Sequence, residues 1–280
     1  MRNLTDTVVL VTGSTDGLGR AVAERLAVDG ATVLIHGRDG EKLASTAHEL
    51  RSVSGNDRVR TYVADFASLE QVRAMAHEVE AENHRLHVLI NNAGVGSGKP
   101  AGTTRQESAD GYELRFAVNH LASFVLTTRL LHLLRRSAPA RVVNVASAGQ
   151  YPIDFDDVML EREYEGARAY RQSKLAQIMF GFDLAERIPA DEVTVNSLHP
   201  ATFMPTKIVL EQHGHSVDSL EDGVEATLRL AVGADVDGVT GRYFNRQEEA
   251  RAEDQAYDPM ARRRLWELSA KLTGESATVG

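Results

Sequence analysis

The chain has 280 residues, 42% of them hydrophobic and 25% charged, which is the composition of an ordinary globular protein. Its 31 basic and 40 acidic residues give a net charge of −9, so we expect no binding to nucleic acid or to an anionic membrane surface. The chain has no cysteine, which excludes disulfides, thiolate catalysis and cysteine metal sites.

The ends and the histidines of the chain suggest no membrane span and no metal. The N-terminal residues form no apolar signal segment, and no run reaches the roughly 18 apolar residues of a membrane helix, so we expect a cytoplasmic protein. The close histidine pairs His84/His87 and His213/His215 have no carboxylate at ligand spacing. The cluster Arg262-Arg263-Arg264 is expected to be a solvated helix face.

Short β-branched segments alternate along the chain with longer segments of helical periodicity. The expected strands are Val8–Val11, Thr32–Ile35, Val59–Val63, Val88–Ile90, Val142–Val145, Val193–Leu198 and Arg242–Phe244. This alternation predicts a single α/β domain over residues 1–280: a Rossmann-type, doubly wound, mostly parallel sheet of about seven strands with helices on both faces. Ligands of such sheets bind beyond the carboxyl ends of the strands.

A glycine-rich loop follows the first expected strand and opens a helical segment. Glycine lets the loop turn tightly and lets its backbone approach a ligand, while the N-terminus of the helix suits a pyrophosphate. An ordinary strand-to-helix turn needs fewer glycines. We therefore expect a dinucleotide site that includes Gly13, Ser14, Thr15, Asp16, Gly17, Leu18 and Gly19.

Tyr170 and Lys174 are four residues apart in a segment of helical periodicity, so they share one helix face. A nearby ammonium favours phenolate and lowers the pKa of a phenol from its usual value near 10, which makes it a usable proton donor or acceptor. The same spacing also occurs by chance on solvated helices. The pair therefore depends on the other motifs for its interpretation.

Seven motifs in a fixed order resemble the short-chain dehydrogenase/reductase family over essentially the whole chain. They are the loop Gly-x-x-x-Gly-x-Gly, Asn91-Asn92-Ala93-Gly94, Asn119, Ser147, Tyr170, Lys174 and His199-Pro200-Ala201. Ser147 and Tyr170 are 23 residues apart (170 − 147), farther than in many members. That insertion, the dipeptide Arg38-Asp39 and the C-terminal segment 265–269 resemble the retinol-dehydrogenase-like branch.

The resemblance implies roles for four residues. Tyr170 is expected to be the general acid or base that exchanges a proton with the substrate oxygen. Lys174 lowers the pKa of the phenol and holds the nicotinamide ribose, and Ser147 hydrogen-bonds the substrate oxygen. Asn119 helps to hold a water that links the lysine to solvent, although an asparagine within a helix most often just faces water.

The resemblance also favours NADP (NADPH) over NAD. Members that prefer NAD carry an acid where Gly37 stands, whereas Arg38 is placed to bind the 2′-phosphate of NADP. Asp39 complicates this assignment, because it could pair with Arg38 or contact ribose. Asp16 likewise stands where some NADP-preferring members carry a basic residue.

Further cofactor contacts follow from the same resemblance. Asp65 matches an adenine-contacting aspartate, or it caps the helix that starts near Ser68. Pro205 stands where the family has a threonine, so Thr202, Thr206 and the backbone at Phe203 are alternatives beside the carboxamide. The remaining expected contacts are Phe66, Asn92, Ala93, Gly94, Tyr170, Lys174 and Pro200.

Two segments are candidates for the substrate site. The inserted segment, about residues 148–168, is a solvated excursion or a wall of the site, and Pro152 argues against a continuous helix there. Its Tyr164, four residues before Arg168, is a weaker catalytic pair because the neighbouring acids raise the pKa of the phenol. Residues 203–220 read as an apolar substrate lid or as a helix against a partner subunit.

We therefore expect an NADP-preferring oxidoreductase that interconverts a carbonyl and an alcohol on an apolar aldehyde, ketone or secondary alcohol. One alternative is a non-catalytic, NAD(P)-binding, redox-sensing regulator, although such proteins typically lose the tyrosine or lysine. Another is an isomerase or lyase with a tightly held dinucleotide. The helices near 117–134 and 170–185 resemble those that pair subunits in the family, which predicts a homodimer or homotetramer.

Overall fold

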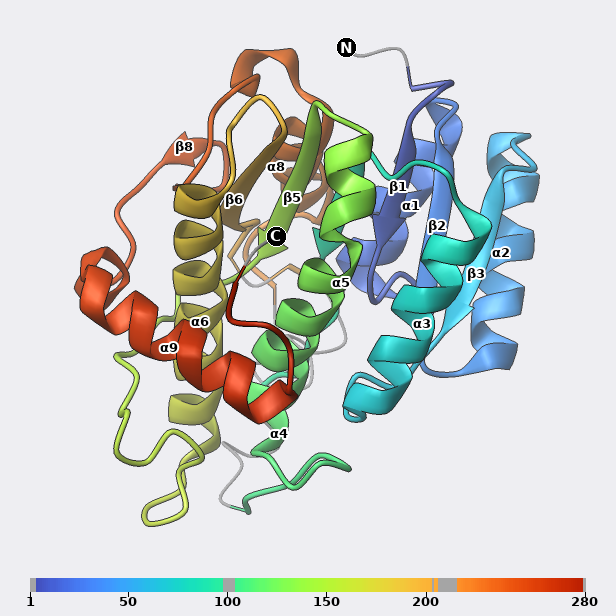
Figure 1. The fold of residues 1–280 in the computed structure, drawn as a ribbon. Coiled ribbons are helices and arrows are strands. Elements are labelled where there is room, and N and C mark those ends of the chain that lie inside the picture. Colours follow the sequence, from blue (N-terminus) through green and yellow to red (C-terminus); the bar gives the residue numbers. More distant parts are fainter. Residues whose placement is uncertain (1–3, 98–103, 203, 206–215, 279–280) are drawn as a thin grey trace.

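The computed structural model describes residues 4–97, 104–202, 204–205 and 216–278 (Figure 1). In this part of the chain one sheet has the strand order β3-β2-β1-β4-β5-β6-β7-β8, and all neighbouring strands pair in parallel except β7 and β8. The strands are β1 (Val8–Val11), β2 (Thr32–Gly37), β3 (Val59–Val63), β4 (Val88–Asn91), β5 (Ala140–Val145), β6 (Val193–His199), β7 (Arg242–Asn245) and β8 (Glu248–Glu249).

Helices cover both faces of the sheet (Figure 1). One face carries α1 (Gly17–Val28), α2 (Gly40–Ser54) and α8 (Leu220–Val232). The other carries α3 (Leu69–Glu82), α5 (Ala122–Arg136), α6 (Gly166–Arg187) and α9 (Pro259–Thr273). The shorter elements are α4 (Leu114–Phe116), the π-helix η1 (Ala117–Leu121) and the 3₁₀ helices η2 (Ala234–Val236) and η3 (Asp254–Tyr257).

The strand residues are buried on both faces, as a covered parallel sheet requires. In β1, Val9 and Val11 pack with α1 and α8, whereas Leu10 packs on the opposite face with the α3 and α5 side. Successive side chains of a strand point to opposite faces, so each strand contributes to both hydrophobic clusters. The prediction of a doubly wound, mostly parallel sheet is therefore confirmed.

The sequence did not predict β8. This strand has two residues, Glu248 and Glu249, both exposed at the edge of the sheet, so it carries no apolar pattern that could mark it. Most of the lid segment expected over residues 203–220 lies outside the described residues. Within the described ranges, we find no helix that combines the length and the apolarity needed to cross a bilayer.

The C-terminal helix α9 packs across α6 (Figure 1). Its Trp266 is buried against Phe124 of α5 and Phe180 of α6, with ring centroids 5.1 and 5.8 Å away. Arg262 was expected to be solvated with its neighbours, and this was wrong: its side chain is buried and bonds to Glu186 and to the carbonyl of Ala256. The subunit pairing expected through α5 and α6 stays a prediction.

Candidate active site

Four predicted residues meet at the carboxyl edge of the sheet. Ser147 lies just beyond β5, Tyr170 and Lys174 lie on α6, and Asn119 lies in the π-helix that precedes α5. Since β4, β5 and β6 pair in parallel, the segments that follow them emerge at one edge. The 23-residue separation of Ser147 and Tyr170 is therefore closed by the fold.

The hydroxyls of Tyr170 and Ser147 share a hydrogen bond. This bond favours the phenolate, but burial favours the neutral phenol more strongly, so the pKa of Tyr170 lies above its usual value. Ser147 is fixed in turn, because its carbonyl accepts from the Tyr243 hydroxyl at 3.1 Å and its Oγ accepts from the Gly149 N–H at 3.0 Å. Tyr243, on β7, had no predicted role.

The ammonium of Lys174 points toward the sheet. Its Nζ donates to the carbonyl of Val145 at 2.8 Å and to Oε1 of Gln177 at 3.3 Å. Burial decides the direction of the Tyr170 pKa in this structure, so the expected lowering of that pKa by Lys174 stays a prediction. Burial also lowers the pKa of Lys174 itself to about 8, which leaves the amine mostly charged at neutral pH.

Asn119 is fully buried, so the alternative that it faces water was wrong. Its Oδ1 accepts from the Val95 N–H at 2.8 Å, and its Nδ2 donates to the Val95 carbonyl at 3.1 Å and to Oγ of Ser173 at 2.9 Å. Asn119 thereby joins the loop after β4 to α6, one residue before Lys174. Its expected role in holding a water stays a prediction.

The glycine loop packs closely against the segment after β4. Gly13 has φ +64°, and a Cβ on it would lie 2.8 Å from Cα of Ala93. A Cβ on Gly19 would overlap the carbonyl oxygen of Gly13 and Nδ2 of Asn92. Asn92 itself donates to the carbonyls of Thr12 and Gly13 at 2.8 and 3.1 Å. These two glycines are therefore required by close packing within the protein, and a pyrophosphate at the start of α1 stays a prediction.

His36, on β2, binds this loop and was missed by the sequence reasoning. Its Nδ1 accepts from the Gly13 N–H at 3.0 Å, so its Nε2 carries the proton and donates to the carbonyl of Ala64 at 3.0 Å. Burial lowers the pKa of His36 to about 4, and its ring stacks on Phe66 at 4.2 Å. A histidine inside a strand pattern gives no sequence signal for such a role.

Ser14 is also bound to β2. Its N–H donates to the carbonyl of His36 at 2.9 Å, and its buried Oγ donates to the carbonyl of Val11 at 2.9 Å. These bonds hold Ser14 within the protein, and its expected contact with a cofactor stays a prediction. Phe66 is similar, because its buried ring is occupied by the stack with His36.

The end of β2 leaves no room for an acid at position 37. A Cβ on Gly37 would lie 2.5 Å from Cγ2 of Thr15, whereas the next residue, Arg38, is exposed and has no hydrogen-bond or ion-pair partner among the described residues. Asp39 does not pair with Arg38: it caps α2, and its Oδ1 accepts from the Lys42 N–H at 3.0 Å.

Asp16 has a similar structural task at α1. One carboxylate oxygen accepts from the Gly17 N–H at 2.8 Å, and the other lies 3.0 Å from Nζ of Lys42. Both acids near the expected ribose position are thus helix caps. The cap of α3 is Ser68, so the alternative that Asp65 caps this helix was wrong; Asp65 instead accepts from the Ala67 N–H at 2.9 Å.

Beyond β6, the buried Pro200 is followed two residues later by Thr202, which makes two polar contacts. The Thr202 hydroxyl lies 3.2 Å from Nε2 of His199, and its N–H donates to Oδ2 of Asp218 at 2.5 Å. Arg246 also binds this carboxylate, at 2.7 Å. The expected contacts at Phe203 and Thr206 lie outside the described residues.

The inserted segment is packed onto the protein. Ile153 and Val158 are buried, and Gln172 of α6 donates to the carbonyl of Val158 at 2.8 Å. Gln255 brackets Ile153 with two hydrogen bonds, of 2.6 and 3.0 Å. The segment is therefore no solvated excursion, and α6 begins only at Gly166, as Pro152 suggested.

Tyr164 does not form a second catalytic pair. Its hydroxyl donates to Oε1 of the buried Glu113 at 3.1 Å, and burial together with this carboxylate raises the pKa of the phenol. Arg168 instead pairs with Asp154 at 3.3 Å. We expected Glu161, Glu163 and Glu165 to raise this pKa, but they are exposed, and Glu113 is the acid that raises it.

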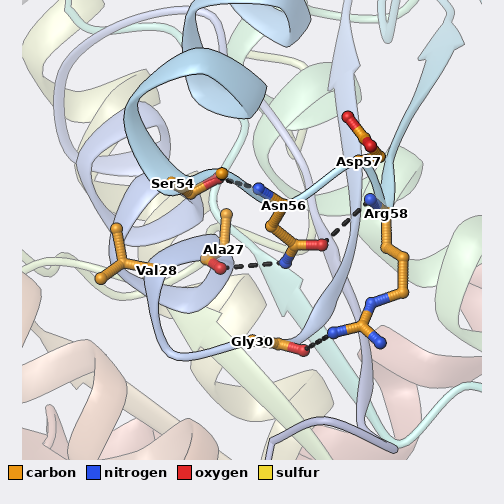
Figure 2. Close-up of a pocket in the computed structure, with 8 residues that line it drawn as sticks. Ala27, Val28, Gly30, Ser54, Asn56, Asp57 and Arg58 are labelled. Carbon is orange, nitrogen blue, oxygen red and sulfur yellow. Dashed lines mark hydrogen bonds between the residues drawn. The ribbon is translucent and has the colours of Figure 1, made fainter.

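A hollow at the other end of α1 and α2 has a structural explanation (Figure 2). Asn56 donates to the carbonyls of Ala27 and Ala31 at 2.9 and 2.8 Å, and Arg58 donates to the carbonyl of Gly30 at 2.6 Å. These bonds of Asn56 and Arg58 join the ends of the two helices. Among the described residues, no three histidine or acidic side chains cluster as metal ligands do.

Comparisons with known proteins agree with this geometry. Residues 7–213 match the family model of short chain dehydrogenases. Human retinol dehydrogenase 13 is 36% identical over 287 residues, covering 96% of this chain and 85% of the relative, and human retinol dehydrogenase 14 is 36% identical with 95% and 86% covered. The Pseudomonas aeruginosa RhlG/NADP complex superposes with a TM-score of 0.70 at 28% identity, covering 88% of this chain and 97% of that one.

The chain therefore belongs to the short-chain dehydrogenase/reductase family. It is an oxidoreductase that acts on CH–OH groups. Within that family it lies in the retinol-dehydrogenase-like branch, because the two human retinol dehydrogenases are 36% identical to it over at least 95% of this chain.

Replacing His36 tests its role in the stability of the fold. Between pH 6.5 and 4 the unfolded state binds a proton that folded His36 does not, so stability must fall as the pH falls. From pH 7 to pH 5 this one histidine is expected to cost about 2 kcal/mol. In His36→Phe that share of the acid sensitivity should vanish.

Urea unfolding of the two proteins at pH 7 and pH 5 measures this difference. The exposed His48, replaced by alanine, is the matched control and should leave the pH dependence unchanged. An undiminished acid sensitivity in His36→Phe contradicts the assigned role.

Proposed function

We propose that this protein is an NADP-preferring enzyme that interconverts a carbonyl and an alcohol, with Tyr170 as the general acid/base. The observation that carries the proposal is the hydrogen-bonded pair of Tyr170 and Ser147, with Lys174 one helical turn further along α6 and anchored to the end of β5. Family membership supports the same reaction type. The glycine loop at the start of α1 is the proposed site of a dinucleotide, which when bound would supply or accept the hydride.

Each residue of the site has a different role at the substrate oxygen. In the reduction direction, the Ser147 hydroxyl donates a hydrogen bond to the carbonyl oxygen and Tyr170 transfers a proton to it as negative charge develops. Lys174 keeps a positive charge beside this oxygen and thereby favours the phenolate that remains. Asn119 holds the loop after β4 against α6, so the lysine and tyrosine stay aligned.

The preference for NADP rests on the end of β2. Gly37 has no space for the acid that would bind ribose hydroxyls, and the nearby Asp16 and Asp39 already cap helices. Arg38 is exposed at the same place and suits a bidentate contact with a phosphate. Solved relatives that carry NADP, such as the RhlG complex, support this assignment.

The proposed substrate is a moderately apolar aldehyde, ketone or secondary alcohol. Support comes from the relatives named retinol dehydrogenases and from the inserted segment, which packs beside α6 at the site. The apolar residues in the sequence of the expected lid, residues 203–220, also favour an apolar substrate. The cytoplasmic location and the homodimer or homotetramer stay predictions from the sequence.

Tyr170→Phe tests the mechanism. We expect kcat to fall by about 10²- to 10⁴-fold, the range for a lost general acid, while NADPH binding changes little. Fluorescence titration of NADPH and steady-state turnover of a reducible aldehyde measure the two effects. Tyr164→Phe is the matched control and should retain turnover; a Tyr170→Phe enzyme with a near wild-type rate would rule out the assigned role.

Arg38→Ala tests the cofactor preference. Loss of a charge-assisted contact with the 2′-phosphate should lower kcat/KM for NADPH by about 10- to 100-fold and leave the value for NADH nearly unchanged. Arg58→Ala, at the hollow in Figure 2, removes a cation far from this position and serves as the control. A wild-type enzyme that prefers NADH would show that Asp39 outweighs Arg38.

A further inference from the structure

Lys174 is held by two acceptors, one at the end of β5 and one on its own helix α6. The Val145 carbonyl at the end of β5 lies 2.8 Å from Nζ, and Gln177 supplies the second acceptor, Oε1, at 3.3 Å. Gln177 is fully buried on α6, three residues after the lysine. Its Nε2 donates to the carbonyl of Asn91, the last residue of β4, at 3.3 Å.

The amide of Gln177 has only one workable orientation. The carbonyl of Asn91 can only accept a hydrogen bond, and the Lys174 ammonium can only donate. Nε2 must therefore face Asn91 and Oε1 must face the lysine. Both polar ends of the amide are used. A reversed amide would place the acceptor Oε1 against the Asn91 carbonyl and the donor Nε2 against the ammonium.

The frame behind Gln177 is also fixed. Nδ2 of Asn91 donates to Oδ1 of Asn144 on β5 at 2.9 Å and to Oγ1 of Thr127 on α5 at 3.0 Å. All of these residues are buried. Lys174 is thus linked through Gln177 to a set of polar side chains that spans β4, β5 and α5.

No charged side chain compensates the buried ammonium among the described residues. Nζ bonds to the Val145 carbonyl and to Gln177, and Gly94 and Asn119 lie beside it. Tyr170, one helical turn earlier on α6, is the titratable group on the same helix face. Burial is the cause that lowers the pKa of Lys174, so hydrogen-bond acceptors are what favour its charged form.

We propose that Gln177 is a positioning residue for the reaction, which fixes the direction and the charge of the Lys174 ammonium through Oε1 while Asn91 fixes the amide. An ammonium has three N–H donors, and Val145 and Gln177 take two of them. The third would be available to Tyr170 or to the ribose of a bound cofactor. This inference rests on the proposed function for its catalytic meaning, but its structural content can be measured without turnover.

Titration of Lys174 by NMR tests the proposal directly. The chain has five lysines, Lys42, Lys99, Lys174, Lys207 and Lys271, so protein labelled with ε-¹³C-lysine gives few signals, and Lys174→Arg assigns the relevant one. Gln177→Met keeps the length of the side chain but removes the acceptor. Its Lys174 should titrate about one pH unit lower than in the wild type, the shift that corresponds to one hydrogen bond to a charged group. Gln177→Glu places a negative charge there and should move the titration upward.

Gln172→Met is the matched control. Gln172 is also buried on α6, but it bonds to the inserted segment, so its loss should leave the Lys174 titration in place. In turnover assays, the loss of kcat/KM on raising the pH should shift in the same direction as the NMR titration in each Gln177 variant.

The two possible failures are distinguishable. If Gln177→Met does not fold, Gln177→Glu still decides, since an unmoved Lys174 titration in that variant overturns the proposal. Unmoved titrations in both variants overturn it as well. Wild-type protein that turns over no carbonyl substrate, together with shifted titrations, would contradict the proposed function and leave the role of Gln177 standing.

Discussion

The parallel pairing of β4, β5 and β6 is the constraint on which the site depends. Because these strands run in one direction and in register, the residues that end them lie side by side: Asn91 pairs with Asn144, and Val145 with Leu198. The carbonyl of Val145 can then receive Lys174 from α6, and Ser147 comes within reach of Tyr170. Segments that are far apart in the sequence thereby form one site.

Polar side chains inside the protein hold this arrangement in place. Asn119, Gln177 and Asn91 are fully buried, yet each makes hydrogen bonds that join two or more elements. A buried polar group is costly unless its partners are present, so such a network stabilises one arrangement and disfavours others. His36 has the same effect on the cofactor side, where it connects the glycine loop to the end of β3.

Much of this site could be predicted from the sequence, for a physical reason. The four-residue spacing of Tyr170 and Lys174 places both on one helix face, and the alternation of strands and helices places the motifs at one edge. The tertiary partners could not be predicted in this way. Lys174 turns toward the Val145 carbonyl, and Arg262 is buried against Glu186; both outcomes depend on groups distant in the sequence.

The central claim is that the enzyme transfers hydride between a nicotinamide and a carbonyl carbon held by Ser147 and Tyr170. Mass spectrometry of the alcohol formed from an apolar aldehyde with NADPH deuterated at one C4 position tests it most directly. The account predicts that deuterium from only one of the two C4 positions appears on the carbinol carbon, because a bound ring would present one face to the carbonyl carbon. An alcohol that carries deuterium from neither position, or equally from both, would contradict the account.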